Sequence, residues 1–186
     1  MPFPSPEITI ADRKIGLNHP TYFIADVAAN HDGDLDRAIE LIRLAAEAGA
    51  EAAKFQNFRA PKIVSDYGFK SLGGQQSHQA EWNKSVYEVY DDASVPFEWT
   101  PILKEACDEF NVHYFSSPYD YDAIEMLDAY VPAYKAGSGL MSWPEALVRM
   151  AKMGKPISHM FLTFMSTGQP DTPIDLSNDQ TQQVLV

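Results

Sequence analysis

The sequence predicts an α/β fold in which helices connect parallel strands. The main observation is a strand–loop–helix–strand pattern over residues 22–58. Residues 22–27 form an apolar run as long as a buried strand. From Leu35 onward, apolar residues recur at spacings of three and four, which is typical of an amphipathic helix. A second strand-like run over 51–58 completes a βαβ unit, which requires parallel strands and a right-handed crossover. Strand-like and helix-like runs continue to alternate as far as Ile157.

The first helix is bounded by residues that commonly start and end helices. Asp34 is the predicted N-cap, because its carboxylate can accept hydrogen bonds from the free N–H groups of the first turn. Gly49 marks the end, since glycine readily adopts the left-handed conformation that closes many helices. In the strand that follows, Lys54 and Gln56 are one strand period apart and therefore share a face.

Polar residues gather where these two strands end. Asp26, Asn30 and His31 lie at or after the end of the first strand, and Lys54 and Gln56 lie in the second. In α/β barrels, ligands bind at the carboxyl ends of the strands. A lysine within an apolar strand is costly to bury without an anion, so Lys54 is expected to face an anionic ligand. The alternative is an ion pair between this lysine and a carboxylate inside the fold.

Residues 1–20 are expected to contain a small β-hairpin. Ile8 and Ile10 alternate with polar residues, and Ile15 follows after a polar stretch at 12–14, which is a hairpin pattern rather than that of a central strand.

Residues 59–94 are expected to be a long irregular segment. Segments of this length in compact domains are usually binding loops or disordered, and Trp82, Tyr87 and Tyr90 argue against disorder. The stretch GQQSHQAEW offers amide, imidazole and indole groups that suit sugar hydroxyls. These groups are compatible with a binding loop; the alternative is a surface loop held down by its aromatic residues.

A helix is predicted over 96–111, with Thr100 and Pro101 as its start signal. Its expected apolar face consists of Ile102, Leu103, Ala106, Cys107 and Phe110. Cys107 on this face is expected to be a small core residue rather than a nucleophile.

The next predicted strand covers 112–117, and His113 within it is expected to pack against a helix. Asp120 is then predicted to cap a helix that runs to Ala129, with Ile124 and Leu127 directed inward.

Two more strands and one helix follow. A short strand at 133–139 places Lys135 and Gly137 on one face. Residues 142–145 fit a capping box for a helix that ends at Gly154, and a strand is expected after Pro156. The inward residues expected of this helix are Ala146, Leu147, Met150 and Ala151.

Composition excludes several classes of function. The chain has 186 residues, 45% of them hydrophobic, which suits one globular domain. A formal net charge of −12 argues against nucleic acid or an anionic membrane as partner, and no apolar run is long enough to span a bilayer. The single cysteine excludes an internal disulfide and a cysteine-rich metal site. With no evident signal peptide, these features indicate the cytoplasm.

The stretch from residue 25 to 58 resembles the opening of the N-acetylneuraminate (sialic acid) synthase family. That family carries an A-E-x-x-x-N-H-x-G loop, then a helix, then K-F-Q in the second barrel strand. The matching residues here are Ala25, Asn30, His31, Gly33, Lys54, Phe55 and Gln56. The chain departs at Asp26, where the family usually has glutamate. The segments around Ser117, around Lys135 to Gly139 and around Gly154 to Pro156 are also similar.

The resemblance implies a TIM-type (β/α) barrel, of which we expect about five of eight βα units. The expected strands lie near Tyr22, Ala52, His113, Ala133 and Ile157. The predicted organisation is a hairpin at 1–20 that plugs the bottom of the barrel, a partial barrel at 21–168 and a polar tail at 169–186. Beyond Pro156 the similarity fades, so we expect a shortened family member without the last three units and the C-terminal antifreeze-like domain.

The resemblance also implies a reaction, the condensation of phosphoenolpyruvate with N-acetylmannosamine or a related amino sugar. Its products are a nine-carbon 2-keto sugar acid and phosphate. By the same resemblance, the catalytic residues are Asp26 and Lys54, and the substrate-binding residues are Gln56, Ser117, Lys135, Ser138, Asn30 and His31. A cationic cradle would hold phosphoenolpyruvate, and Asp26 would handle protons.

The family enzyme also uses a divalent metal, with Mn²⁺ expected, whose histidine ligands lie on later strands. None of the following occupies a matching position: His19, His78, His113 and His159. We therefore expect no metal site in this chain.

Two alternatives stay open at this point. The chain could be another phosphoenolpyruvate-dependent synthase, of the heptulosonate or octulosonate phosphate type. The NHDG and KFQNF motifs favour a sialic acid synthase instead. It could also be a non-catalytic half-barrel that binds a ligand or partner. An open barrel leaves strand edges unpaired, so a homodimer or other oligomer is expected.

Overall fold

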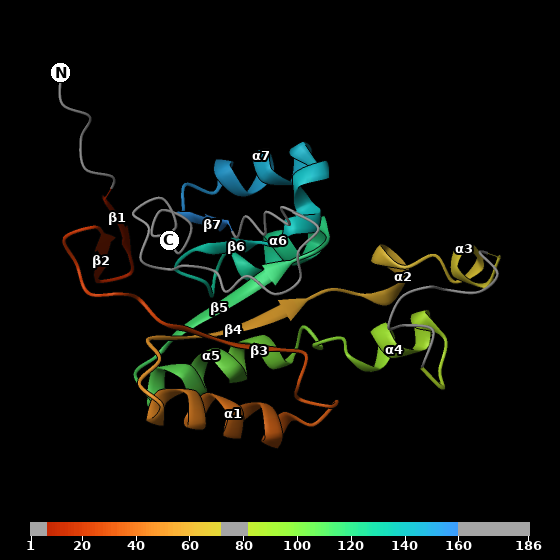
Figure 1. Ribbon diagram of the computed structural model, residues 1–186, viewed down its shortest axis with the longest axis horizontal. Coiled ribbons are helices and arrows are strands. Elements are labelled where there is room, and N and C mark those ends of the chain that lie inside the picture. The colour runs from red at the N-terminus through yellow and green to blue at the C-terminus, as the bar shows by residue number, and fades with distance from the viewer. Residues whose placement is uncertain (1–6, 72–81, 160–186) are drawn as a thin grey trace, which may run out of the picture.

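The computed structural model describes residues 7–71 and 82–159 and shows an α/β fold (Figure 1). Three parallel strands form one sheet in the order β3 (Ile24–Ala28), β4 (Ala52–Asn57), β5 (His113–Pro118). A second parallel pair, β6 (Tyr134–Ala136) and β7 (Ile157–His159), continues beside β5. Each of the five expected strands is therefore present, in the expected order.

Four of the described helices cover the strands from outside. In Figure 1, α1 (Leu35–Glu47) and α5 (Trp99–Glu109) lie together below the sheet, and α6 (Tyr121–Leu127) and α7 (Pro144–Lys152) lie above it. The main hydrophobic core fills the space between strands and helices. Its largest fully buried side chains include Tyr114, Tyr134, Phe55, Ile42, Leu103 and Ile124.

The predicted cap of α1 is confirmed. The Asp34 carboxylate accepts a hydrogen bond from the backbone N–H of Arg37 at 3.1 Å. Gly49 has a φ of +86°, the left-handed conformation for which glycine is suited, and it follows the C-cap residue Ala48. The loop is short, and β4 starts at Ala52.

The other face of the strands packs against the N-terminal segment. There β1 (Glu7–Ile10) and β2 (Arg13–Gly16) form an antiparallel pair in which Ile8 lies opposite Ile15. A second hydrophobic cluster joins this pair to the start of the strands. Its buried members are Ile10, Ile15, Ala52, Phe115 and Ala133. The amino ends of the strands are thus covered on the face opposite the helices.

His113 does not pack against a helix as expected. Its ring stacks on that of Tyr22 with centroids 5.8 Å apart, and the Tyr22 hydroxyl lies 2.5 Å from its Nδ1. Asp12 lies 3.3 Å from its other ring nitrogen. Because His113 is on the strand face that looks toward the N-terminal segment, its partners come from that segment.

The apolar face of α5 differs from the expectation at one position. The helix starts at Trp99, and Leu103, Ala106 and Cys107 are buried, but Ile102 is 40% exposed. Ile102 lies one residue, and hence about 100°, away from the centre of the buried stripe. The expected core position of Cys107 is confirmed.

Two details of α7 were also predicted wrongly. Ala151 is exposed, whereas Ala146 and Met150 are buried. The N-cap residue is Trp143 and makes no side-chain cap, because the Ser142 hydroxyl instead donates to the Gly139 carbonyl at 2.9 Å. The residues before α7 form a 3₁₀ helix, η2 (Ser138–Ser142), and Ser142 is its last residue.

The described part of the segment expected to be irregular, residues 59–71 and 82–94, contains three short helices. They are α2 (Ala60–Ile63), α3 (Asp66–Ser71) and α4 (Val86–Asp92), and they stand beyond the arrowhead of β4 in Figure 1. A capping box starts α4, in which Ser85 and Glu88 each accept a hydrogen bond from the other's backbone N–H. Most of the GQQSHQAEW stretch lies outside the described residues, as do residues 1–6 and the tail from residue 160 onward. In the described part of the chain, none of the helices has the length and apolar character needed to cross a membrane.

The contrast between Leu103 and Ile102 gives a direct test of the core. Leu103→Ala removes a fully buried side chain and is expected to lower the free energy of unfolding by about 2–5 kcal/mol. Ile102→Ala, the matched control on the same helix, should cost less than about 1 kcal/mol because Ile102 is partly in solvent. Urea denaturation of both variants measures the difference, and equal losses would contradict the described orientation of α5.

Candidate functional site

Three charged side chains meet on the inner face of the strands. Asp26 of β3 and Lys54 of β4 are register partners, and Lys54 Nζ lies 2.7 Å from Asp26 Oδ1. Lys54 is only 6% exposed, whereas the Asp26 side chain is 56% exposed. The buried lysine therefore has an internal carboxylate partner, as the alternative in the sequence analysis supposed, and this partner is open to a ligand.

Lys135 of β6 is the third charged member. Its Nζ donates to the Ala136 carbonyl at 2.9 Å. Burial lowers the pKa of Lys135, and the like charge of Lys54 lowers it further, while Asp26 acts in the opposite direction. We call Asp26, Lys54 and Lys135 the charged cluster. With two cations and one anion it carries an excess positive charge, which favours an anionic ligand.

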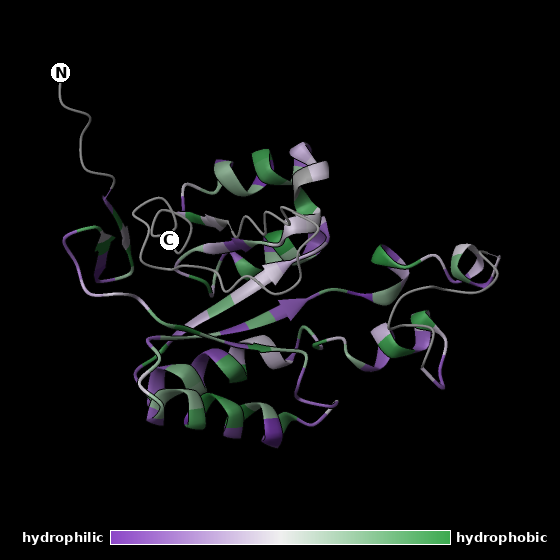
Figure 2. Ribbon diagram, in the orientation of Figure 1, coloured by the Kyte–Doolittle hydropathy of each residue, from purple (hydrophilic) through white to green (hydrophobic). Residues whose placement is uncertain are grey.

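Two polar side chains lie beside the cluster, nearer the carboxyl ends. Gln56 of β4 and Ser117 of β5 are register partners, two residues beyond the Lys54–Phe115 pair. Because alternate residues of a strand share a face, Gln56 lies on the same face as Lys54. Gln56 is half-buried and Ser117 is buried. In Figure 2 the arrowhead of β4 has the hydrophilic colour, which marks this polar end.

Ser138 lies after the end of β6 and is not part of a strand. It is exposed at the start of η2, three residues after Lys135. Within residues 7–71 and 82–159, no hydrogen bond joins Ser138 to the charged cluster. Its role in binding stays a prediction.

Asn30 and His31 have contacts that shape the loop after β3. Asn30 donates to the Val27 carbonyl at 2.9 Å. His31 is fully buried, accepts from the Gly33 N–H at 3.1 Å, and meets the Trp99 ring edge-on with centroids 5.5 Å apart. Burial lowers the pKa of His31, which favours the neutral ring. Substrate binding by these two residues also stays a prediction.

Tyr119 was missed by the sequence analysis. It follows β5 directly, its ring meets Phe58 edge-on at 6.0 Å, and burial together with the nearby carboxylate of Asp26 raises its pKa. The available signal was an aromatic residue with a hydroxyl immediately after the carboxyl end of a strand, which is where barrel enzymes place ligand-binding groups.

A second missed feature ties two strand ends together. Arg59, just after β4, contacts both carboxylate oxygens of Asp120 at 3.0 and 3.1 Å. Asp120 also caps α6, as predicted, by accepting from the Ala123 N–H at 2.9 Å. The ion pair therefore fixes the start of α6 against the end of β4.

The residues in the described ranges do not fit a divalent metal. There, no three or more His, Cys, Asp or Glu side chains are grouped so that they could hold an ion. His19 pairs with Glu7, and His113 is held by Tyr22 and Asp12. His78 and the side chain of His159 lie outside the description.

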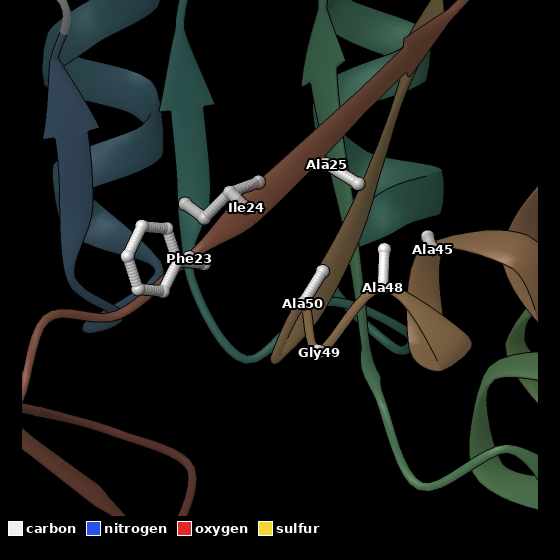
Figure 3. A pocket seen from close by; sticks show the side chains of 7 residues that line it. All are labelled: Phe23, Ile24, Ala25, Ala45, Ala48, Gly49 and Ala50. Carbon is white, nitrogen blue, oxygen red and sulfur yellow. The ribbon is translucent and has the colours of Figure 1, made fainter.

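A hollow of about 380 Å³ lies at the other end of β3 (Figure 3). Phe23, Ile24 and Ala25 line one side of it, and Ala45 and the 48–50 turn after α1 line the other. It contains none of the charged side chains and is lined by apolar groups. This hollow is therefore not the candidate catalytic site.

Comparison with known proteins identifies the family. The model of the NeuB family matches residues 41–173. The chain belongs to the NeuB family. This result confirms the resemblance to sialic acid synthases.

Similar characterised relatives agree with this assignment. The human N-acetylneuraminate-9-phosphate synthase is 32% identical over 146 residues, which cover 78% of this chain and 40% of that protein. The pseudaminic acid synthase of Campylobacter jejuni (strain 81-176) is 34% identical over 153 residues, which cover 79% and 41% respectively. The spore coat polysaccharide biosynthesis protein SpsE of Bacillus subtilis is 32% identical over 151 residues, covering 80% and 39%.

A solved structure shows the same fold. The N-acetylneuraminic acid synthetase of Leptospira borgpetersenii, crystallised with citrate, superposes with a TM-score of 0.70 at 27% identity. The match covers 84% of this chain and 50% of that one. The parallel α/β fold is thus that of the TIM-type barrel synthases. The chain spans about two fifths of the length of the curated relatives named above.

The charged cluster predicts how Lys135 titrates. Its pKa should lie below the ordinary lysine value of 10.5. Asp26→Asn should lower it further by removing an attractive charge, and Lys54→Met should raise it by removing a repulsive one. NMR titration of lysine side-chain carbons measures these shifts, with Lys62→Met on α2 as the control that leaves Lys135 unchanged.

The same shift has a consequence for stability. Between the lowered folded-state pKa and the unfolded-state value, the folded chain binds fewer protons, so the free energy of unfolding contributed by Lys135 rises with pH. A Lys135 signal that titrates together with exposed lysines would contradict the described cluster.

Proposed function

We propose that the complete protein condenses phosphoenolpyruvate with N-acetylmannosamine or a related amino sugar. The product is a nine-carbon 2-keto sugar acid, formed with uptake of water and release of phosphate. The observation that supports this most directly is the charged cluster, since two lysines from different strands meet beside an open carboxylate. Membership in the NeuB family and relatives named for such sugar acids support the same reaction.

Each side chain has a role that its chemistry allows. Lys54 and Lys135 hold the phosphate and carboxylate of phosphoenolpyruvate through charge-assisted hydrogen bonds. Ser117 and Ser138 supply hydroxyl donors to the same ligand. The new carbon–carbon bond joins C3 of phosphoenolpyruvate to the aldehyde carbon of the open-chain sugar.

Asp26 and Gln56 are proposed to face the sugar. Asp26 is the proton-handling group, because its carboxylate is exposed on one side and held by Lys54 on the other. Asn30 and His31 are proposed to hold the loop from which Asp26 projects. A divalent ion, with Mn²⁺ proposed, would serve in the family enzyme to polarise the aldehyde; the described residues of this chain offer no ligand set for it.

A second candidate function is that of a non-catalytic half-barrel that binds phosphoenolpyruvate or a partner without turnover. It requires only the charged cluster, whose excess positive charge suits an anionic ligand. A heptulosonate phosphate synthase activity has weaker support. The Thermotoga maritima enzyme of that type shares only the fold, at 13% identity and a TM-score of 0.54.

Calorimetric titration with phosphoenolpyruvate tests the proposed site. The 186-residue chain is expected to bind it, and Lys135→Met should weaken binding about 10- to 100-fold because a hydrogen bond to a charged group is lost. Lys62→Met is the matched control. Added Mn²⁺ should leave the affinity unchanged, since the described residues provide no ligand set.

Phosphate release in the presence of N-acetylmannosamine then separates the two candidates. Release that Lys135→Met abolishes supports the synthase, and binding without release supports the half-barrel. If the folded chain fails to bind phosphoenolpyruvate at all, the proposed site is wrong.

We further propose that the chain forms a homodimer or other oligomer in the cytoplasm. Within the described residues β3 pairs only with β4, so its other edge is unpaired. The apolar hollow of Figure 3 adjoins this edge, and Phe23 on its rim is 62% exposed. Two copies of a chain with a net charge of −12 repel each other. An interface between copies is therefore least costly at a surface without charged side chains, such as this one.

Light scattering tests the oligomer. The expected mass exceeds that of one 186-residue chain, and Phe23→Asp should lower it by placing a charge on the proposed contact. Tyr67→Asp is the control, because Tyr67 is 84% exposed on α3, away from the hollow. A monomeric wild-type chain would overturn the proposal.

A further inference from the structure

The hydroxyl of Tyr119 has no assigned role, although its position is closely defined. The Tyr119 backbone N–H donates to the Asn57 carbonyl at 3.0 Å, which ties the residue to the end of β4. Its ring meets Phe58 edge-on, and Tyr90 meets the same Phe58 with centroids 5.6 Å apart. These contacts use the ring alone, and phenylalanine would satisfy them equally well.

The hydroxyl itself reaches toward β6 on the inner face of the strands. A Cβ added to Gly137 would lie 3.0 Å from the Tyr119 oxygen and 3.4 Å from the adjoining ring carbon. Gly137 is two residues beyond Lys135 and shares its strand face. The oxygen therefore lies where a side chain at position 137 would point, beside the charged cluster.

The Tyr119 side chain is partly buried, and its hydroxyl forms no hydrogen bond to any residue that the structure describes. Partial burial, and after it the nearby carboxylate of Asp26, raise the pKa of Tyr119, so that the hydroxyl stays protonated at neutral pH. A hydroxyl donor near Asp26 of the charged cluster, with no hydrogen-bond partner among the described residues, suits an anionic oxygen that arrives with a ligand.

We propose that the Tyr119 hydroxyl is a further substrate-binding group, which donates a hydrogen bond to an anionic oxygen of the phosphoenolpyruvate held by Lys54 and Lys135. Gly137 leaves room for this hydroxyl, because a side chain there would require the hydroxyl to move by a few tenths of an ångström. The inference rests on the proposed function and adds to it two residues, one that binds and one that provides space.

The test compares phosphoenolpyruvate binding by calorimetry in four chains: wild type, Tyr119→Phe, Gly137→Ala and the double variant. Tyr119→Phe should weaken binding about tenfold, because one charge-assisted hydrogen bond is lost. Gly137→Ala should weaken it to a similar extent by moving the hydroxyl. In the double variant the clashing oxygen is gone, and binding should be no weaker than in Tyr119→Phe alone.

Controls separate binding from folding. Tyr67→Phe on the exposed face of α3 should bind like wild type, and thermal unfolding should give Tyr119→Phe nearly the midpoint of the wild type, since the ring contacts remain. Unchanged affinity in Tyr119→Phe would overturn the inference while leaving the proposed function intact. Additive losses in the double variant would overturn the role of Gly137. Failure of the folded wild-type chain to bind phosphoenolpyruvate would instead overturn the proposed function, and this inference with it.

Discussion

The ion pair between Lys54 and Asp26 is the constraint on which the candidate site depends. An ammonium group that is almost completely buried in a central strand costs several kcal/mol unless an anion accompanies it. The chain meets this requirement from the neighbouring strand, and the register that brings Asp26 opposite Lys54 also aligns Ile24 with Ala52. If β4 shifted by one residue, Phe55 would turn toward Asp26, and Lys54 would turn toward the apolar core between strands and helices.

The alternation of side chains along the strands separates structure from chemistry. Residues that face the helices, such as Phe55 and Tyr114, form the main core. On the opposite face, the amino ends of the strands are apolar and lie under the β1–β2 pair, whereas their carboxyl halves carry the polar and charged groups. On this face, the amino ends of the strands therefore form a packed apolar layer, and their carboxyl ends form the polar site.

Much of this arrangement could be predicted from the sequence, because local signals and tertiary structure agree at those places. Asp34 and Asp120 cap helices as expected, since each lies directly before its helix and its carboxylate reaches a first-turn N–H. The predicted Ser142 cap is absent because the Ser142 hydroxyl forms a hydrogen bond within the preceding 3₁₀ helix. The local sequence pattern does not indicate that helix. The helices at 60–92 were missed because they are too short to show an apolar period.

The site itself was predictable only in part. Motif similarity located Asp26, Lys54 and Lys135, and the structure brings these three together. Motif similarity could not reveal the Arg59–Asp120 pair, which joins strand ends about 60 residues apart in the chain. Nor could it reveal the contact between Tyr119 and Gly137, which are 18 residues apart. Such contacts follow from the three-dimensional order of the strands and have no local sequence signal.

The burial of Cys107 has a practical consequence. It is the single cysteine of the chain, it has no exposed surface, and burial raises the pKa of its thiol to about 12. Because the thiolate is the reactive form, alkylating reagents react poorly with this residue in the folded protein. A cysteine introduced on the surface would then be the one reactive thiol, so a fluorophore or spin label can be attached at a chosen position without first removing the native residue.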